Sequence, residues 1–322
     1  MTDTQGILIE VKIGSPNNRI ESDEVWRTPR ASCVTLGNET MTDDSQIKLG
    51  VLQYLRAHGL RADEIPESDV QGEQRPDIEA SYQGQCYVIE LKRKLSEAEM
   101  IASYQSRLSA GQVVSHRETT ERTNTISGVV AEAAEQLTAY CDNADIRIVW
   151  LDGQGWDPSL QMLQIKASLF GTRQIIDLSK TKDSRECFYF GFSDFFRHRD
   201  TIDLAVVRAH DQAQLCVNNF SPRYQIAKSS YLREVFGSAV VDPLEWEKEG
   251  SIYLADCDLD RRDTDAIVEY LKDKYQKPDL IDMEMKSISA TMAVPDSREA
   301  QQPSAPYRSQ PRDARLQTNG ER

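Results

Sequence analysis

The feature that most constrains the fold is an apolar hexapeptide near the middle of the chain. Residues Ile146–Leu151 read IRIVWL and are apolar at every position except Arg147. Nearly continuous apolar runs of this length are typical of strands buried on both faces of a sheet. The preceding segment, Ile126–Cys141, has apolar side chains at helical spacing, as expected for a helix that packs on such a sheet. Together they predict an α/β fold with a mixed sheet flanked by helices.

Composition excludes several classes of protein. The chain of 322 residues carries 38 Lys and Arg against 52 Asp and Glu, a net charge of −14. This acidic balance argues against a protein that coats nucleic acid by bulk charge, but it permits a local basic strip. No apolar run approaches the roughly 20 residues that span a bilayer. The first residues lack the basic and apolar regions of a secretory leader, so we expect a cytoplasmic protein.

The cysteines and histidines give no indication of a zinc site. The six cysteines lie far apart without a Cys-x-x-Cys pair, and the four histidines are scattered. Structural zinc sites need closely spaced ligands. We therefore expect reduced thiols that lie mostly in the core.

Changes in composition divide the chain into four segments. Strand-like alternation occurs over Gly6–Gly14 and again over Ala31–Leu36. Helical and strand patterns alternate through the centre, and from Ser287 onward Pro, Ser, Gln and Arg dominate, as in disordered tails. The predicted segments are residues 1–42 as an amino-terminal β extension, 43–208 as the core, 209–286 as a small α/β extension or domain, and 287–322 as a disordered tail.

Local patterns predict the elements within these segments. Apolar spacing and capping residues indicate helices, and alternation bounded by turn residues indicates strands. The expected helices are 45–58, 96–108, 126–141, 159–170, 225–236 and 263–275. The expected strands are 78–82 and 86–91, joined by a tight turn, with further strands at 146–151, 174–178, 187–192, 202–207, 214–217 and 251–254. Residues 111–125 have no clear period and are expected to form a loop.

The residues that indicate chemistry lie on the predicted hairpin. Arg75-Pro76-Asp77 leads into its first strand, and Glu90-Leu91-Lys92 ends its second. Side chains two apart on a strand share a face, so Glu90 and Lys92 point the same way, and the hairpin can bring Asp77 beside Glu90. Two carboxylates with water-filled positions suit Mg²⁺, and an ammonium beside them can orient water and offset transition-state charge.

This pattern resembles the PD-(D/E)XK nuclease superfamily, the restriction-endonuclease-like fold. The resemblance implies that Asp77 and Glu90 ligate Mg²⁺, that the Leu91 carbonyl is a further ligand, and that Lys92 is the catalytic lysine. Mn²⁺ would be a plausible substitute for the metal. The order of elements fits the family core, in which a helix precedes three strands, a second helix and a fourth strand. Segment 43–208 would then be the nuclease-like core.

A second motif supports the resemblance. RecB-like branches of the superfamily carry Gln-x-x-x-Tyr on the helix after the lysine strand, and Gln136-Leu137-Thr138-Ala139-Tyr140 matches it. Gln136 and Tyr140 are four apart and so share one helix face. The resemblance implies that they support the site or contact the nucleic-acid backbone. It covers residues 43–152, about a third of the chain.

The sequence departs from the family pattern on the first helix. The family carries a glutamate there, and the corresponding position is Lys48, with Asp44 nearby. Asp44 is the candidate for the third metal-binding acid. Without such an acid the site would hold one metal ion or be inactive, so the alternative hypothesis is a catalytically degenerate nuclease-like module that binds nucleic acid or protein.

Basic residues follow the motif along the chain. Arg93 and Lys94 extend the lysine strand, and Arg117 and Arg122 lie in the following polar segment. A local basic strip can hold a phosphate backbone despite a negative net charge, because salt screens the remaining field within about 8–10 Å. The alternative for Arg117 and Arg122 is that they solubilise an exposed loop. We therefore expect a Mg²⁺-dependent phosphodiesterase acting on nucleic acid, DNA in the first instance, in defence, restriction or repair. A homodimer or a partner protein is left open.

Overall fold

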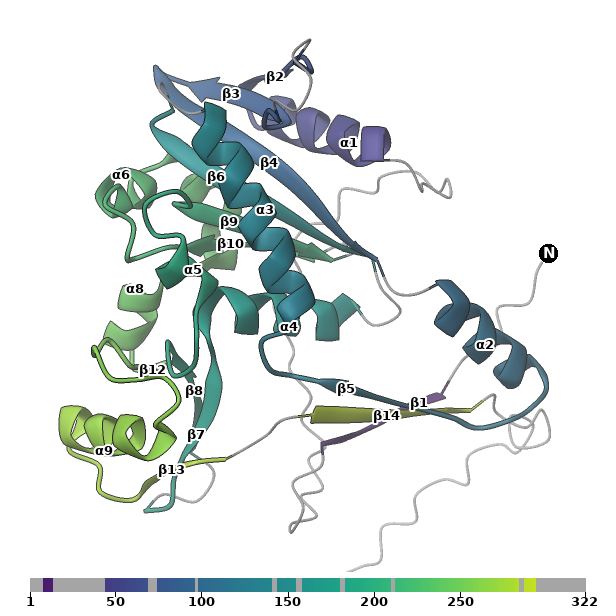
Figure 1. The fold of residues 1–322 in the computed structure, drawn as a ribbon, viewed down its shortest axis with the longest axis vertical. Coiled ribbons are helices and arrows are strands. Elements are labelled where there is room, and N and C mark those ends of the chain that lie inside the picture. The colour runs from purple at the N-terminus through teal and green to yellow at the C-terminus, as the bar shows by residue number, and fades with distance from the viewer. Residues whose placement is uncertain are drawn as a thin grey trace, which may run out of the picture.

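The computed structural model describes most of the chain and places its strands in three sheets. It describes residues 8–13, 44–68, 74–95, 98–140, 144–154, 158–179, 183–209, 212–283 and 287–293. The largest sheet has seven strands in the order β11-β10-β9-β6-β4-β3-β2. In Figure 1 it occupies the upper part of the molecule, with helices on both of its faces.

The centre of the large sheet is parallel. Strand β6 (Ile146–Gln154) lies between β4 (Gln85–Leu95) and β9 (Leu204–Ala209) and pairs in parallel with both. Antiparallel pairs β3–β4, β2–β3 and β9–β10 extend the sheet on either side, with β2 at Arg61–Glu64, β3 at Ile78–Tyr82 and β10 at Gln212–Val217. The short β11 (Val240–Val241) closes one edge. The mixed sheet expected from the sequence is therefore present.

The apolar hexapeptide explains why β6 is central. Ile148 and Trp150 pack into the apolar cluster on one face of the sheet, and Val149 and Leu151 pack into the cluster on the other. Strand β9 alternates in the same way, and its apolar residues from Leu204 to Val207 are fully buried. A strand with this pattern is stable only between two layers of helices.

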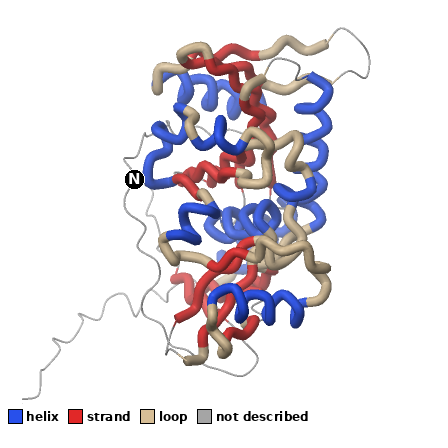
Figure 2. The backbone as a smooth tube through the Cα atoms, turned by 90° about the vertical axis from the view of Figure 1, so that its left-hand side faces the viewer, coloured by secondary structure: helices blue, strands red, loops and turns tan. Residues whose placement is uncertain are grey.

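Those two layers are formed by different helices. On one face α1 (Asp44–Ala57) packs together with α6 (Tyr224–Lys228) and α7 (Tyr231–Phe236). On the other face lie α3 (Asn124–Tyr140) and α4 (Pro158–Phe170). Figure 2 shows the strands between these helices.

Two smaller sheets complete the fold. Strands β1 (Leu8–Ile13), β14 (Ser287–Ala293) and β5 (Val114–Thr119) form an antiparallel sheet beside α2 (Ala98–Ser109). The four-stranded sheet consists of β7, β8, β12 and β13 and packs against α9. Its strands are β7 (Arg173–Asp177), β8 (Asp183–Phe188), β12 (Tyr253–Leu254) and β13 (Leu280–Asp282), and the helix α9 spans Thr264–Tyr275. The short helices α5 (Asp194–Arg197) and α8 (Pro243–Lys248) lie in connections.

Three local expectations were wrong. The predicted loop 111–125 contains β5, because Val114–Thr119 pairs with a strand from the far end of the chain. The start of the predicted tail forms that partner strand, β14. The predicted helix 225–236 is two short helices, interrupted at Ser229 and Ser230, whose types favour turns and caps over helix interiors. The expected strand at 31–36 lies outside the described residues.

The predicted boundary at residue 208 falls within a hairpin. Strand β9 ends at Ala209 and β10 pairs with it directly in the same sheet. The segment 209–286 also supplies β12 and β13 to the sheet that contains β7 and β8. Its strands therefore continue sheets that begin in the segment 43–208. None of the helices in the described ranges combines the length and the apolar character needed to cross a membrane.

Candidate functional site

Asp77 directly precedes β3 and is held by hydrogen bonds to β4. Its N–H donates to the Ile89 carbonyl at 3.1 Å, and its carboxylate Oδ2 accepts a hydrogen bond from the Leu91 N–H at 2.8 Å. The Asp77 side chain is 23% exposed. The preceding proline favours an extended entry into the strand, which suits this position. The hairpin therefore brings Asp77 beside the Glu90–Lys92 segment, as the sequence predicts.

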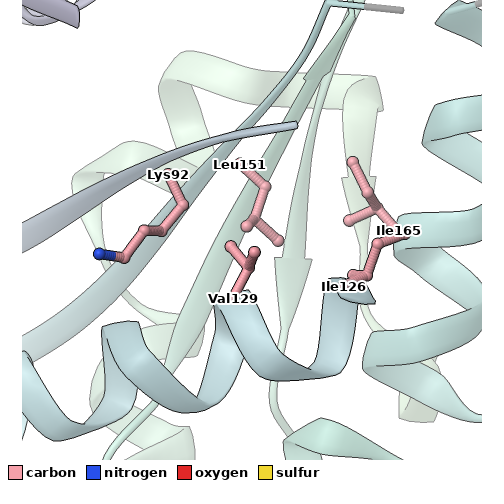
Figure 3. A pocket seen from close by; sticks show the side chains of 5 residues that line it. All are labelled: Lys92, Ile126, Val129, Leu151 and Ile165. Atoms are coloured by element: carbon pink, nitrogen blue, oxygen red, sulfur yellow. The ribbon is translucent and has the colours of Figure 1, made fainter. Parts of the chain in front are cut away.

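Glu90 and Lys92 lie on the face of β4 that α3 covers. Lys92 Nζ lies 2.9 Å from Glu90 Oε1 and donates a hydrogen bond to Gln136 Oε1 of α3 at 2.5 Å. Figure 3 shows the Lys92 stem beside apolar side chains of a small pocket, with its ammonium directed away from them. The apolar lining is Ile126, Val129, Leu151 and Ile165. Burial of the Lys92 stem thus leaves the charged end among the polar groups of the site.

Glu90 is the most buried member of the site. Its exposed fraction is 2%, and its Oε2 atom has no hydrogen-bond partner among the described residues. Burial, followed by the negative charge of Asp77, raises the pKa of Glu90 to about 7, although the ion pair with Lys92 opposes the change. A buried polar atom without a partner is unfavourable, so a cation that binds this oxygen lowers the free energy of the site.

Lys48 approaches Asp77 from the opposite face of the sheet. Its Nζ lies 2.9 Å from Asp77 Oδ1 and 2.9 Å from Glu64 Oε1, at the end of β2. Burial alone would lower the pKa of Lys48, but hydrogen bonds and charges from Glu64 and Asp77 outweigh burial and raise the pKa. Lys48 is therefore a stable cation, and it stands where the resemblance leads one to expect a glutamate.

The donor set fits one Mg²⁺ ion. Asp77 and Glu90 supply two carboxylates, and the unsatisfied Glu90 Oε2 is available for coordination. The Leu91 N–H donates to Asp77, so the backbone of Leu91 lies beside that carboxylate. Mg²⁺ binds one or two carboxylates and keeps several waters. Across the described ranges no group of three or more His, Cys, Asp and Glu side chains forms a ready metal cage.

The other predicted site residues divide into two groups. Gln136 joins the site through Lys92, whereas Tyr140 ends α3 with 36% of its surface exposed. Arg93 alternates with Lys92 and so lies on the α1 face of the sheet. Asp44 begins α1, one turn before Lys48. The side chains of Lys94 and Asp44 lie outside the described part of the structure.

Arg122 and Arg117 lie outside β4, the strand that carries Arg93 and Lys94. Arg122 Nη2 donates to Oδ1 of buried Asp194 at 3.2 Å, and Ser127 donates to the other oxygen of Asp194 at 2.6 Å. This pairing gives Arg122 a structural role. Arg117 lies on β5 in the three-stranded sheet, apart from the sheet that carries Glu90. Its side chain is not among those described.

Sequence reasoning missed the Lys48–Asp77–Glu64 arrangement. The sequence marks Lys48 only as the residue where the resemblance leads one to expect a glutamate, and it gives Glu64 no role. The arrangement depends on β2, which was not predicted and which pairs with β3 so that Glu64 lies opposite Ile78. The alternating residues Arg61–Asp63 directly precede Glu64, and this short alternation is the feature of the sequence that indicates β2.

No family model, curated protein or solved structure matches this chain. The case for a function therefore rests on the geometry of the chain itself.

Proposed function

We propose that this protein is a divalent-metal-dependent nuclease of the PD-(D/E)XK type that hydrolyses DNA. The observation that carries the proposal is the convergence of Asp77, Glu90 and Lys92, with Lys92 held between Glu90 and Gln136. The restriction-endonuclease-like fold is part of this proposal, and the mixed α/β sheet flanked by helices is consistent with it.

The roles of the residues follow from their positions. Asp77, Glu90 and the Leu91 carbonyl would hold Mg²⁺ or Mn²⁺, which when bound supplies a Lewis acid for the phosphoryl oxygens. Lys92 has three N–H donors, of which Glu90 and Gln136 accept two, and the third can orient water or a phosphate oxygen. In the reaction a water oxygen bonds to phosphorus, the bond from phosphorus to one sugar oxygen breaks, and that oxygen takes a proton.

The test is metal-dependent cleavage by the full chain. Supercoiled, linear and single-stranded DNA are incubated with Mg²⁺ or Mn²⁺, with EDTA as the negative control. We expect Asp77→Asn and Lys92→Met to reduce cleavage by at least about 100-fold, in line with the loss of an electrostatic catalytic group. Lys272→Met, which removes a lysine on the distant α9, is the matched control. Unchanged cleavage by Lys92→Met contradicts the assignment.

The Lys48–Asp77 ion pair favours a second candidate, the catalytically degenerate binding module. In that case Lys48 permanently neutralises Asp77, and the site binds no metal. A titration with Mn²⁺ followed by thermal melting separates the two, because a ligand that binds only the folded state raises the melting temperature. A metal-dependent rise that Asp77→Asn removes supports the nuclease. No rise, together with DNA binding in a gel-shift assay, supports the binding module.

A further inference from the structure

Three carboxylates and two ammonium groups form one continuous network at the start of β3. Lys48 bridges Asp77 and Glu64 with distances of 2.9 Å to each, and Lys92 lies 2.9 Å from Glu90. Asp77 is the link between the two halves, because its charge acts on both Lys48 and Glu90. The network has an outer half around Lys48 and an inner half around Glu90.

The two halves differ in whether their carboxylate oxygens have hydrogen-bond or ion-pair partners. In the outer half the Lys48 ammonium contacts an oxygen of Glu64 and an oxygen of Asp77. In the inner half Glu90 Oε2 is buried without a hydrogen-bond partner in the described part of the chain. An incoming divalent ion therefore meets an unsatisfied oxygen in the inner half and a resident positive charge in the outer half.

We propose that Lys48 is a built-in cation that takes the place of a second metal ion, so that this site binds a single divalent ion at Asp77 and Glu90. The inference rests on the proposed function, because it assumes that the inner half binds metal. An ammonium that bridges two carboxylates occupies the position that a second ion, bound by the same pair, would need. The ammonium and such an ion would compete for the same two carboxylate oxygens, so only one of them can occupy this position.

The fold holds Lys48 in this position. Ile47 and Val51 of α1 are buried against the sheet, which fixes the helix and holds the intervening Lys48 at the start of β3. Glu64 is fixed by the β2–β3 ladder, and the following Ile65 N–H donates to the Asp77 carbonyl at 3.0 Å. The Lys48 side chain is 20% exposed, so solvent screens its charge only in part.

The experiment counts bound Mn²⁺ ions per chain by equilibrium dialysis. Wild type is compared with Lys48→Glu and Lys48→Met, and Arg56→Met on the same helix is the control, because Arg56 pairs with exposed Asp63. We expect one Mn²⁺ in wild type and in the control. Lys48→Glu should bind two ions. Lys48→Met should bind the first ion on the order of 10- to 100-fold more tightly, because a nearby positive charge is lost.

The possible failures are distinguishable. Two ions in wild type, or one ion of unchanged affinity in both Lys48 variants, overturns the inference and leaves the nuclease proposal standing. No Mn²⁺ bound by any of the four proteins overturns the inference together with the metal-dependent function. Thermal melting of each variant establishes that it is folded, and Lys48→Met answers the question of affinity if Lys48→Glu fails to fold.

Discussion

Gln136 of α3 accepts a hydrogen bond from Lys92 of β4 at 2.5 Å, and this contact ties the helix to the candidate catalytic strand. Lys92 lies 2.9 Å from Glu90 as well, so its ammonium has one partner on the strand and one on the helix. Two anchors hold a flexible lysine in one place, and catalytic groups require such preorganisation.

The first prediction concerns this helix anchor. Gln136→Leu removes the acceptor and should lower the free energy of unfolding by about 1.5–3 kcal/mol, the range for hydrogen bonds to charged groups. In the proposed nuclease it should also lower kcat about 10- to 100-fold with little change in KM, because the lysine is less well positioned. Steady-state cleavage and urea unfolding measure the two effects. Exposed Glu135→Leu, on another face of α3, is the control, and an equal loss of kcat there would argue against a positioning role.

The second prediction is a pH dependence of stability that arises from Glu90. Its pKa in the folded protein is raised from 4.5 to about 7, mainly by burial. Between these pH values the folded state keeps a proton that the unfolded state releases, so the contribution of Glu90 to stability falls as pH rises through this window. The expected loss is roughly 3 kcal/mol and is complete above about pH 7.

Glu90→Gln isolates this contribution, because glutamine cannot titrate and keeps an acceptor for Lys92. The difference in unfolding free energy between wild type and Glu90→Gln is measured in urea at pH 5 and pH 7.5. We expect wild type to lose stability relative to the variant over this interval. Glu132→Gln, at an exposed position, should show no such change. A gain in the unfolding free energy of wild type relative to Glu90→Gln over the same interval would contradict the prediction.

The parts of the fold set by local patterns could be predicted from the sequence. The β3–β4 hairpin follows from alternation, β6 from a continuous apolar run and α3 from helical spacing, and these elements carry or adjoin Asp77, Glu90, Lys92 and Gln136. Side chains at fixed spacing on one strand share a face whatever surrounds them. The convergence of the predicted residues could therefore be anticipated.

Contacts between distant segments could not be predicted in this way. The Lys48–Asp77 ion pair joins α1 to the start of β3, and β5 is a strand only because β14 reaches it from the other end of the chain. Arg122 follows a polar segment and resembles a solvated charge in sequence, but a buried carboxylate on α5 binds it. Pairings of this kind depend on tertiary packing, which local periodicity does not encode.

The third prediction separates the structural role of Arg122 from a role in phosphate binding. Arg122→Met leaves the carboxylate of Asp194, which is fully buried, with Ser127 as its remaining side-chain partner. Loss of one member of a buried ion pair should cost about 3 kcal/mol of unfolding free energy. Exposed Arg197→Met on α5 should cost far less. The slope of DNA affinity against salt should not change, whereas loss of a phosphate contact would lower it by about 1.

The last prediction concerns Gly171, between α4 and β7. Its φ is +62°, and a Cβ there would lie 2.5 Å from the Gly191 carbonyl oxygen. Backbone atoms cannot move aside as a flexible side chain can, so Gly171→Ala combines a strained conformation with a steric clash. We expect a loss of at least about 3 kcal/mol in urea unfolding. Gly128→Ala in α3 is the control, because a Cβ there meets no heavy atom within 4 Å beyond its chain neighbours and the adjoining helix backbone. That change should stabilise the protein by about 0.5–1 kcal/mol through helix propensity, and equal effects at both glycines would show that the close approach at Gly171 contributes nothing.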